Sequence, residues 1–296
     1  MLRVVERPVR DPGPGEVRLA VHAAAVNPTD IVLRRRGAEE LEPPWVPGMD
    51  AAGVVESAGS GVDRLAVGDA VMAAVAPRRP EGGAQAELVV VPAASVVAIP
   101  AGATLEQAAT LPMNGLTALL GLEQLGLREG QTLAVSGGAG LLASYAIPLA
   151  KLRGLRVLAD AKPEDEALVR SFGADAVLPR GAGFPAAVRE AAPGGVDGLF
   201  DTALLGRSAF PAIRDGGALA VVRGWDDGES ERGIRIEQVW VRTVLERTDW
   251  LDQLRELASE GALQLRVAAT YPPSGAADAQ RLMEAGGLRG RAVIVF

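Results

Sequence analysis

The residues best suited to chemistry lie in a glycine-dense turn, residues 137–140, between an apolar β-branched run and a segment with the length and apolar content of a helix. The hexad that starts at Gly138 fits the spacing Gly-x-Gly-x-x-Gly, with alanine in the last place. A turn without side chains lets the backbone approach a pyrophosphate, and free N–H groups at a helix start attract its negative charge. An ordinary turn is the competing interpretation. The candidate cofactor-binding residues here are Gly138, Ala139, Gly140, Leu141, Leu142 and Ala143.

A second strand-like run lies one helix length downstream, at residues 156–159, and Asp160 ends it. Asp160 follows Gly138 by 22 residues, near the position at which an acidic residue bonds the ribose hydroxyls of a dinucleotide. The order of strand, turn, helix, strand and acid therefore favours dinucleotide binding over an ordinary turn.

Composition excludes several other classes of site. The sequence of 296 residues has no cysteine, which excludes disulfides, thiolate nucleophiles and Cys-based zinc sites. Its only histidine, His22, lies in an alternating run typical of a strand, so the usual Ser-His-Asp and Cys-His arrangements are excluded unless His22 serves. A net charge of −7 argues against nucleic acid and anionic membranes as partners and favours a small molecule.

Two segments bear on membranes and targeting. Residues 131–150 carry no charge and have the length of a membrane span, but glycines, serines and Pro148 interrupt them, so we expect no transmembrane helix. Residues 1–17 are charged and contain three prolines, and they have no apolar core that could act as a signal peptide. We therefore expect a cytoplasmic protein.

The elements that must position these residues change character along the chain. Before residue 100, strand-like runs with Gly- and Pro-rich joints predict a β-rich, barrel-like region. From residue 132 onward strands and helices alternate, which predicts a parallel sheet covered on both faces. The predicted strands are 16–26, 52–56, 70–75, 87–91, 132–136, 156–159, 176–178, 198–200, 218–222, 266–269 and 292–296. The predicted helices are 105–111, 116–125, 142–153, 164–172, 184–191, 208–213, 250–259 and 276–284.

Six sequence blocks, in order along nearly the whole chain, resemble the zinc-free branch of the medium-chain dehydrogenase/reductases, the quinone oxidoreductase or zeta-crystallin group. The blocks are AVNPTD (25–30), PGMDAAGVV (47–55), EGGAQAELVVVP (81–92), LPMNGLTA (111–118), VSGGAGLLA (135–143) and LRGRAVIV (288–295). The resemblance implies an α/β fold with a doubly wound parallel Rossmann sheet in residues 113–265. It also implies a GroES-like β-rich domain, formed by residues 1–112 together with residues 266–296.

The resemblance also bears on the reaction. Zinc-dependent relatives carry cysteine where this chain has Asn27 and histidine where it has Met49, which implies a site without metal. Without a Lewis acid, alcohol oxidation is disfavoured, and hydride delivery from NAD(P)H to a quinone or an α,β-unsaturated carbonyl is the expected reaction. The resemblance thus implies an oxidoreductase that acts on a small molecule, and a homodimer formed through edge strands near residues 233–241.

Residue roles follow from the same resemblance. Thr117 would bind the nicotinamide carboxamide, and Asn27 and Asp30 would border the nicotinamide pocket, although Asn-Pro-Thr-Asp is equally typical of a turn or helix cap. The loop that begins at Arg223 and Gly224 follows the fifth strand of the sheet, close to the expected nicotinamide position. Trp225 and Trp240 are candidate walls of the pocket.

The choice between NADP and NAD depends on three side chains. Asp160 favours NADH, because a carboxylate accepts a hydrogen bond from the ribose hydroxyl and repels a 2′-phosphate. Lys162 and Arg180 follow the second and third strands and could together neutralise that phosphate. We expect NADPH, with NADH as the alternative.

Two other functions stay open. An enoyl-thioester reductase would need basic residues for a phosphate-bearing carrier, and the run at residues 34–36 could supply them. A catalytically weak NADP(H)-binding protein with a structural or regulatory role is the third hypothesis. Leu141 stands where relatives usually have a second glycine, Pro148 lies inside the following helix, and Val32 replaces a frequent tyrosine.

Overall fold

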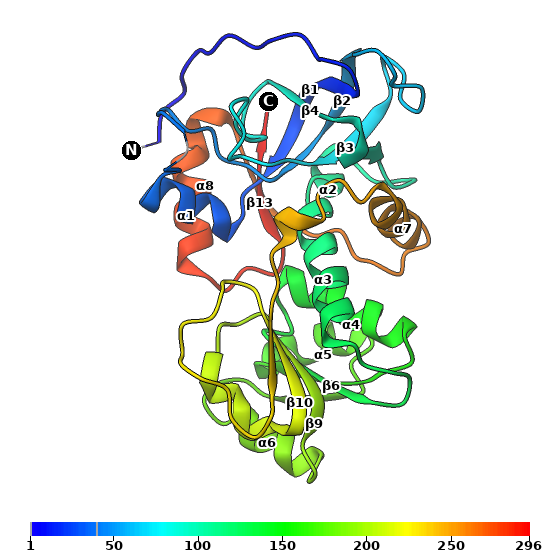
Figure 1. The fold of residues 1–296 in the computed structure, drawn as a ribbon, viewed down its shortest axis with the longest axis vertical. Helices are drawn as coiled ribbons and strands as arrows, with labels where there is room; N and C mark the ends of the chain where they lie inside the picture. The colour runs from blue at the N-terminus through cyan, green and yellow to red at the C-terminus, as the bar shows by residue number, and fades with distance from the viewer. Residues whose placement is uncertain (1, 40) are drawn as a thin grey trace. The chain divides into compact units, whose positions relative to one another are not determined.

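The computed structural model describes residues 2–39 and 41–296, and Figure 1 shows its ribbon. Residues 1 and 40 fall within the predicted first domain and lie outside the described part. The chain forms two compact units: Met1–Met113 with Arg242–Phe296, and Asn114–Val241. Helix α3 (Pro112–Leu125) starts in the first unit and continues in the second.

The first unit is built on a seven-stranded sheet in the order β12-β13-β1-β2-β3-β5, with β4 paired to β1. The central strand β1 (Glu16–Ala25) alternates buried and half-buried residues, and its apolar side chains Val17, Leu19 and Val21 enter the core. This alternation is what one buried face of an antiparallel sheet requires. The other strands are β2 (Asp50–Ala58), β3 (Ala70–Ala74), β4 (Leu88–Pro92), β5 (Val96–Ala98), β12 (Val267–Tyr271) and β13 (Arg291–Val295).

Short helices complete the first unit. Helix α7 packs against β5, and α8 packs against β13 and α1. The helices are α1 (Pro28–Arg36), α2 (Leu105–Ala108), α7 (Thr248–Ser259) and α8 (Ala276–Ala285), with 3₁₀ turns η1 (Ala93–Ser95) and η5 (Pro273–Gly275). A further 3₁₀ turn, η4 (Val241–Thr243), lies where the chain passes between the units.

The second unit is a six-stranded sheet in the order β11-β10-β9-β6-β7-β8, and all neighbouring strands are parallel. From β6 the chain runs to β7 and β8 on one side, and then crosses to β9, β10 and β11 on the other. The reversal between β6 and β9 is a topological switch point, where ligands bind beyond the carboxyl ends of the strands. The strands are β6 (Thr132–Ser136), β7 (Arg156–Ala161), β8 (Ala176–Pro179), β9 (Val196–Asp201), β10 (Ile213–Val221) and β11 (Arg235–Gln238).

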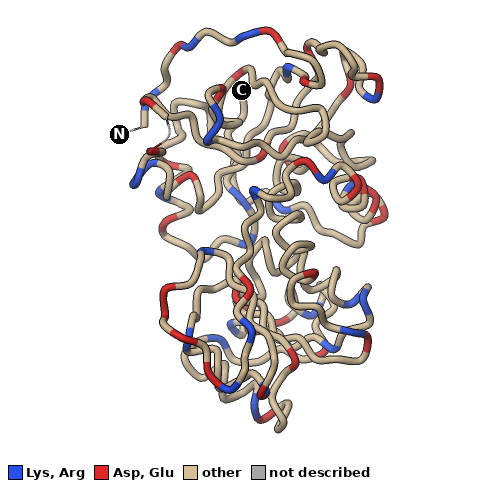
Figure 2. The backbone as a smooth tube through the Cα atoms, viewed as in Figure 1, with Lys and Arg blue, Asp and Glu red and all other residues tan. Residues whose placement is uncertain are grey.

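The helices of the second unit connect these strands. They are α4 (Leu141–Leu152), η2 (Pro163–Asp165), α5 (Glu166–Ser171), α6 (Phe184–Ala191) and η3 (Gly206–Ala212). The helix predicted at residues 208–213 is a 3₁₀ helix instead, because Pro211 cannot donate the backbone hydrogen bond that an α-helix needs there. Acidic and basic residues are mixed along the backbone of both units (Figure 2).

The predicted α/β class, with a doubly wound parallel sheet and a β-rich unit, agrees with this architecture. Helix α1 was not expected, because its nine residues include a proline and end in three arginines and show little amphipathic periodicity. The observed units also divide the chain differently at one end. Residues 242–265, which the sequence prediction places in the Rossmann domain, lie in the first unit, where α7 packs on β5.

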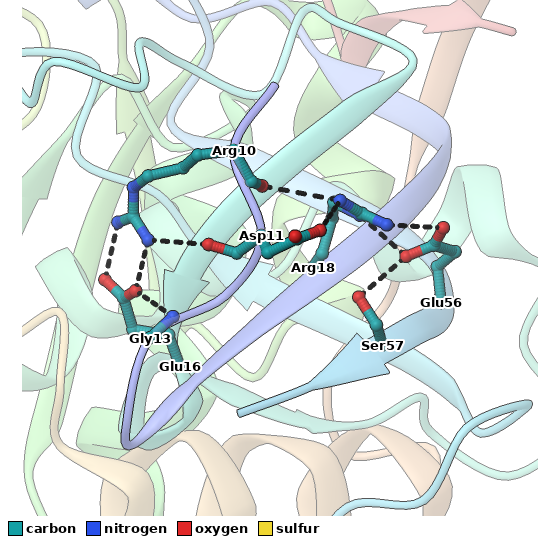
Figure 3. A network of polar contacts seen from close by, with 7 residues as sticks. All are labelled: Arg10, Asp11, Gly13, Glu16, Arg18, Glu56 and Ser57. Carbon is teal, nitrogen blue, oxygen red and sulfur yellow. Dashed lines mark hydrogen bonds and ion pairs between the residues drawn. The ribbon is translucent and has the colours of Figure 1, made fainter. Parts of the chain in front are cut away.

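The segment before β1 is held by ion pairs rather than by strand pairing. Figure 3 shows the network, formed by Arg10, Asp11, Gly13, Glu16, Arg18, Glu56 and Ser57. Arg10 Nη1 lies 2.6 Å from Glu16 Oε2, and Arg18 Nε lies 2.7 Å from Glu56 Oε2. The hydrogen bond from Arg10 lowers the pKa of Glu16 to about 2.

Among the described residues, no helix combines the length and the apolar character that crossing a membrane would require.

Candidate functional site

The glycine turn lies at the switch point of the second unit, between β6 and α4. Gly137 has a φ of 72°, in the left-handed region that glycine adopts without strain. A Cβ added at Gly138 would lie 2.4 Å from the carbonyl oxygen of Asp160, so no side chain fits there. Gly140 is the N-cap of α4 and provides no side chain to cap the helix. The first N–H groups of α4 are therefore left for an anionic ligand.

The rest of the hexad anchors the turn. Leu141 and Ala143 are buried in the first turn of α4, and Ala139 is nearly buried. Leu141, which replaces a usual glycine, therefore packs inward. Helix α4 continues through Pro148 to Leu152.

Asp160 lies at the carboxyl end of β7 and is 2% exposed. Its Oδ1 accepts a hydrogen bond of 2.9 Å from the backbone N–H of Gly138, and its Oδ2 lies 3.6 Å from Arg180 Nη1. Burial raises the pKa of the Asp160 carboxyl, while these two contacts oppose the rise. The structure thus brings Asp160 to the glycine turn and Arg180 to Asp160.

Lys162 takes a different position. Its Nζ lies 3.8 Å from Glu164 Oε1, and both side chains are more than half exposed. The ammonium group is therefore accessible to a ligand phosphate, since an exposed pair at this distance is weak.

The sequence analysis did not identify two buried polar residues that lie at the carboxyl ends of the strands in the second unit. Ser136 ends β6 and Asp201 ends β9, directly opposite each other in the sheet. The Ser136 hydroxyl donates to Asp201 Oδ1 at 2.7 Å, and Asp201 Oδ2 accepts from the N–H of Gly206 at 2.9 Å. Thr202 donates to the carbonyl oxygen of Ser136 at 2.6 Å. An acid at the end of the apolar run 198–200 was the signal that could have identified Asp201.

Arg223 and Gly224 follow β10 at this edge of the sheet. Arg223 is accessible to solvent, and partial desolvation lowers the pKa of its guanidinium. Gly224 has a φ of 82°. Trp225 stacks on Phe210 with ring centroids 5.6 Å apart, and Trp240 is 44% exposed.

Thr117 lies in the second turn of α3 and is 6% exposed. Its side chain is therefore buried.

The first unit holds a separate buried polar cluster. Asn27 precedes α1; its Nδ2 donates to Asp50 Oδ2 at 2.6 Å, and its Oδ1 accepts from Arg291 Nε at 2.8 Å. Asp50 Oδ1 accepts from the backbone N–H of Met113 at 2.6 Å, in the first turn of α3. A carboxylate at a helix start satisfies a free N–H group and is favoured by the helix dipole.

Asp30 is fully buried beside this cluster. Its Oδ2 accepts from the N–H of Asn27 at 2.7 Å and from Gln85 Nε2 at 3.2 Å, and its Oδ1 accepts from the N–H of Gly48 at 2.8 Å. The structure therefore brings the two predicted pocket residues, Asn27 and Asp30, into direct contact. Each is tied to surrounding backbone or buried side chains.

Burial dominates the electrostatics of this cluster. It raises the pKa of Asp30 to about 6 and that of Asp50 to about 7, against the hydrogen bonds and the charge of Arg291. A buried carboxyl is harder to ionise because its charged form loses hydration.

The residues around Asn27 and Met49 do not fit a zinc ion. In the part of the chain that the structure describes, no three His, Asp or Glu side chains are placed to hold a metal. Met49 is buried, and the amide of Asn27 is engaged with Asp50 and Arg291. A zinc site needs about four nitrogen, sulfur or oxygen donors, which are not gathered here.

Comparison with known proteins matches both units. The alcohol dehydrogenase GroES-like domain matches residues 13–101, and a domain described as zinc-binding dehydrogenase matches residues 172–294. The chain is 32% identical over 290 residues to the NADPH-dependent alkenal/one oxidoreductase, chloroplastic, of Arabidopsis thaliana, covering 94% of this chain and 72% of the relative.

Two further matches concern a quinone oxidoreductase homologue and a solved structure. The chain is 35% identical over 186 residues to the quinone-oxidoreductase homolog, chloroplastic, of Spinacia oleracea, covering 60% of this chain and 56% of the relative. A mycobacterial protein solved in complex with NADPH superposes with a TM-score of 0.84 at 28% identity, covering 99% of this chain and 95% of that one. The aligned part spans little more than half the length of the spinach relative.

The fold and the glycine-turn site define a dehydrogenase/reductase of the alcohol dehydrogenase type. The chain belongs to the medium-chain dehydrogenase/reductase family, in its quinone oxidoreductase branch. The family and the fold class expected from the sequence are thus confirmed.

Proposed function

We propose that this chain is an NADPH-dependent, zinc-independent oxidoreductase that transfers hydride to a quinone or an α,β-unsaturated carbonyl. The glycine turn at the switch point supports this most directly, because it fits a diphosphate: Gly138 has no room for a side chain, and the start of α4 has no side-chain cap. The name of the Arabidopsis relative and the NADPH complex of the mycobacterial protein support the same cofactor.

The proposed cofactor-binding residues lie beyond the carboxyl ends of the strands of the second unit, except Thr117, which lies in helix α3. The backbone of residues 138–143 would hold the diphosphate, Lys162 and Arg180 would bind the 2′-phosphate, and Thr117 would bind the nicotinamide carboxamide. Arg223 and Gly224, after β10, would line the nicotinamide half of the site. NADH is the alternative cofactor.

Zinc independence is supported by the residues Asn27 and Met49, whose side chains do not provide the donors that a zinc ion requires. Asn27 uses its side chain to bridge Asp50 and Arg291, and Met49 offers only a thioether. Asn27 and Asp30 are both buried, so we propose that they shape the substrate pocket by fixing the backbone around them.

When bound, NADPH supplies a hydride to an electron-poor carbon of the acceptor. The chain's own residues would bind the cofactor, orient it and exclude water. Val32, where related enzymes often carry tyrosine, has no proton to donate, so the product would take its proton from water.

The test combines binding and turnover. We expect NADPH to raise the midpoint of thermal unfolding saturably, since a ligand at 100 times its Kd adds about 2.7 kcal/mol to the stability of the folded state. We expect the chain to oxidise NADPH when given quinones or enones. Lys162→Ala should weaken NADPH more than NADH, and equal affinities for both cofactors in both proteins would remove the phosphate assignment.

Two outcomes would select the alternatives. Tight NADPH binding without turnover over quinones, enones and enoyl thioesters would select the catalytically weak protein. Turnover of enoyl thioesters alone would select the enoyl-thioester reductase. An enoyl-thioester reductase would use the arginines of residues 34–36 to bind the phosphate of its carrier. Arg34 and Arg35 are less available for this role, because both pair with Glu284, at 2.6 and 2.7 Å.

The proposal includes a cytoplasmic homodimer. Strand β11 is the edge of the six-stranded sheet, and an unpaired edge offers backbone groups to a second copy. A monomer in sedimentation experiments over the working concentration range would contradict this part.

A further inference from the structure

The carboxylate of Asp160 points at the protein's own backbone. The residue stands where an acid is expected to bind ribose, yet its side chain is 4% exposed. Its Oδ1 accepts from the N–H of Gly138 at 2.9 Å, and that glycine packs so closely on the carbonyl of Asp160 that a Cβ would approach it to 2.4 Å. One oxygen is therefore used to hold the turn.

The second oxygen faces Arg180. Arg180 Nη1 lies 3.6 Å from Asp160 Oδ2, and the Arg180 side chain is 42% exposed. The backbone N–H of Arg180 donates to the carbonyl of Ala161 at 3.1 Å, which holds the start of this loop against the end of β7. A ribose ligand needs an accessible carboxylate oxygen, and neither oxygen of Asp160 fits that description.

We propose that Asp160 organises the glycine turn and that Arg180 neutralises its charge, so that the chain accepts a 2′-phosphate despite an acid at the ribose position. This rests on the proposed function. An uncompensated carboxylate would repel the phosphate, whereas the Asp160–Arg180 pair carries no net charge. The acid thus sets the shape of the turn, and the arginine sets the selectivity between NADPH and NADH.

The first experiment needs no cofactor. We compare amide hydrogen exchange of residues 137–143 in the wild type, Asp160→Asn and Asp160→Ala. Asparagine retains an oxygen that can accept from Gly138, and alanine does not. We expect exchange about ten times faster in Asp160→Ala, the factor that one lost hydrogen bond to a charged group produces, and near-wild-type exchange in Asp160→Asn.

The hydrogen-exchange experiment has a control for folding and an outcome that would contradict the organising role of Asp160. Exchange in β9 and the midpoint of thermal unfolding show whether the variants are folded. If Asp160→Ala does not fold, the exchange of the turn is compared between the wild type and Asp160→Asn instead. Unchanged exchange of the turn in a folded Asp160→Ala would overturn the organising role. If no dinucleotide binds to the wild type, the proposed function fails, while this arm still reports on the turn.

The second experiment measures NADPH and NADH affinities by calorimetry. We expect Asp160→Ala to weaken NADH by a factor of about ten, because the turn loses its hydrogen bond, and Asp160→Asn to leave the NADH affinity within about twofold of the wild type. Both variants remove the acidic partner of Arg180, so NADPH should gain relative to NADH in both. If Asp160 were a ribose ligand, Asp160→Asn would weaken NADH about as much as Asp160→Ala does, which would overturn the proposal.

Arg180 is tested through a double variant. Arg180→Ala should weaken NADPH about tenfold relative to NADH, because it uncovers the carboxylate. Adding Asp160→Asn should restore most of that loss if neutralisation is the cause. If the double variant stays as weak as Arg180→Ala, the guanidinium acts only on the phosphate itself, and the neutralising role is wrong.

Discussion

Asn27 donates a 2.6 Å hydrogen bond to Asp50, and both residues are fully buried in the first unit. The same amide accepts from Arg291, and the same carboxylate accepts from the N–H of Met113. A neutral side chain thus links a buried guanidinium to a buried carboxyl group. The link joins the end of β1 to β2, to β13 and to the start of α3.

Removing that link should destabilise the fold. Asn27→Ala removes one buried hydrogen-bond partner from Asp50 and one from Arg291, so we expect the free energy of unfolding to fall by about 3 kcal/mol. Denaturant unfolding measures this loss. The control, Asp63→Ala, removes an exposed acid of the same unit and should change stability by less than about 0.5 kcal/mol. An equally small change in Asn27→Ala would contradict the structural importance of the bridge.

The raised pKa values of Asp50 and Asp30 predict a pH dependence of stability. Their folded-state pKa values of about 7 and 6 lie above the ordinary value of 3.8. Below pH 3.8 these two carboxyl groups are protonated in both the folded and the unfolded protein, and their stabilising contribution to folding is fully present. As pH rises through 7, ionisation of the buried groups removes it, so the free energy of unfolding should fall between pH 5 and 8.

The variant Asp50→Asn isolates one of these groups. It cannot ionise, so its unfolding free energy should vary less between pH 5 and 8 than that of the wild type, whatever its absolute stability. The remaining slope should come in part from Asp30. Denaturant unfolding at both pH values measures the difference, and identical slopes in the two proteins would show that Asp50 does not titrate in this range.

Local patterns were enough to place most of the second unit. The predicted strands 132–136 and 156–159 correspond to β6 and β7, because each is a short apolar run that begins two residues after a glycine, a local pattern that predicts a buried strand without long-range information. The position of Asp160 at a strand end was equally local. Its orientation toward Gly138 was not, because that depends on how closely the turn packs against β7.

The buried cluster shows the limit of such reasoning. Asp50 is 23 residues from Asn27 and 63 from Met113, so no spacing rule connects them. Only the pairing of β1 with β2 and the position of α3 bring these groups together. Sequence reasoning identified Asn27 through its place in the AVNPTD block but gave no reason to single out Asp50.

Ser136 offers a test of how the turn is held from its other side. Ser136→Ala removes the 2.7 Å hydrogen bond to Asp201 and leaves that buried carboxylate with fewer donors. We expect a loss of about 1–2 kcal/mol in stability and NADPH binding weaker by about tenfold. The control Ser171→Ala removes an exposed hydroxyl whose bond is local to its helix. Unfolding and calorimetry measure both, and equal NADPH affinities in the two variants would exclude a role of Ser136 at the turn.

The ion-pair network of Figure 3 predicts that hydrogen exchange in the N-terminal segment depends on pH. The pKa of Glu16 is lowered to about 2 from an ordinary 4.5, so its stabilising contribution is present above pH 4.5 and is lost as pH falls through 2. Glu16→Gln should therefore speed hydrogen exchange in residues 2–15 at pH 7, because the N–H of Gly13 loses its charged acceptor and Arg10 keeps only Glu81 as a charged partner.

Comparison with a neighbouring acid makes this prediction specific. Glu6→Gln changes the same charge in the same segment, but Glu6 lies outside the network, so its exchange pattern should match that of the wild type. At pH 2 the difference between the wild type and Glu16→Gln should shrink, and it should vanish at lower pH, since protonation removes the same charge as the substitution. If Glu16→Gln and Glu6→Gln exchange alike at pH 7, then the contacts of Glu16 do not hold the segment, and other contacts, such as the hydrogen bond from Arg7 to the carbonyl of Pro80, must hold it.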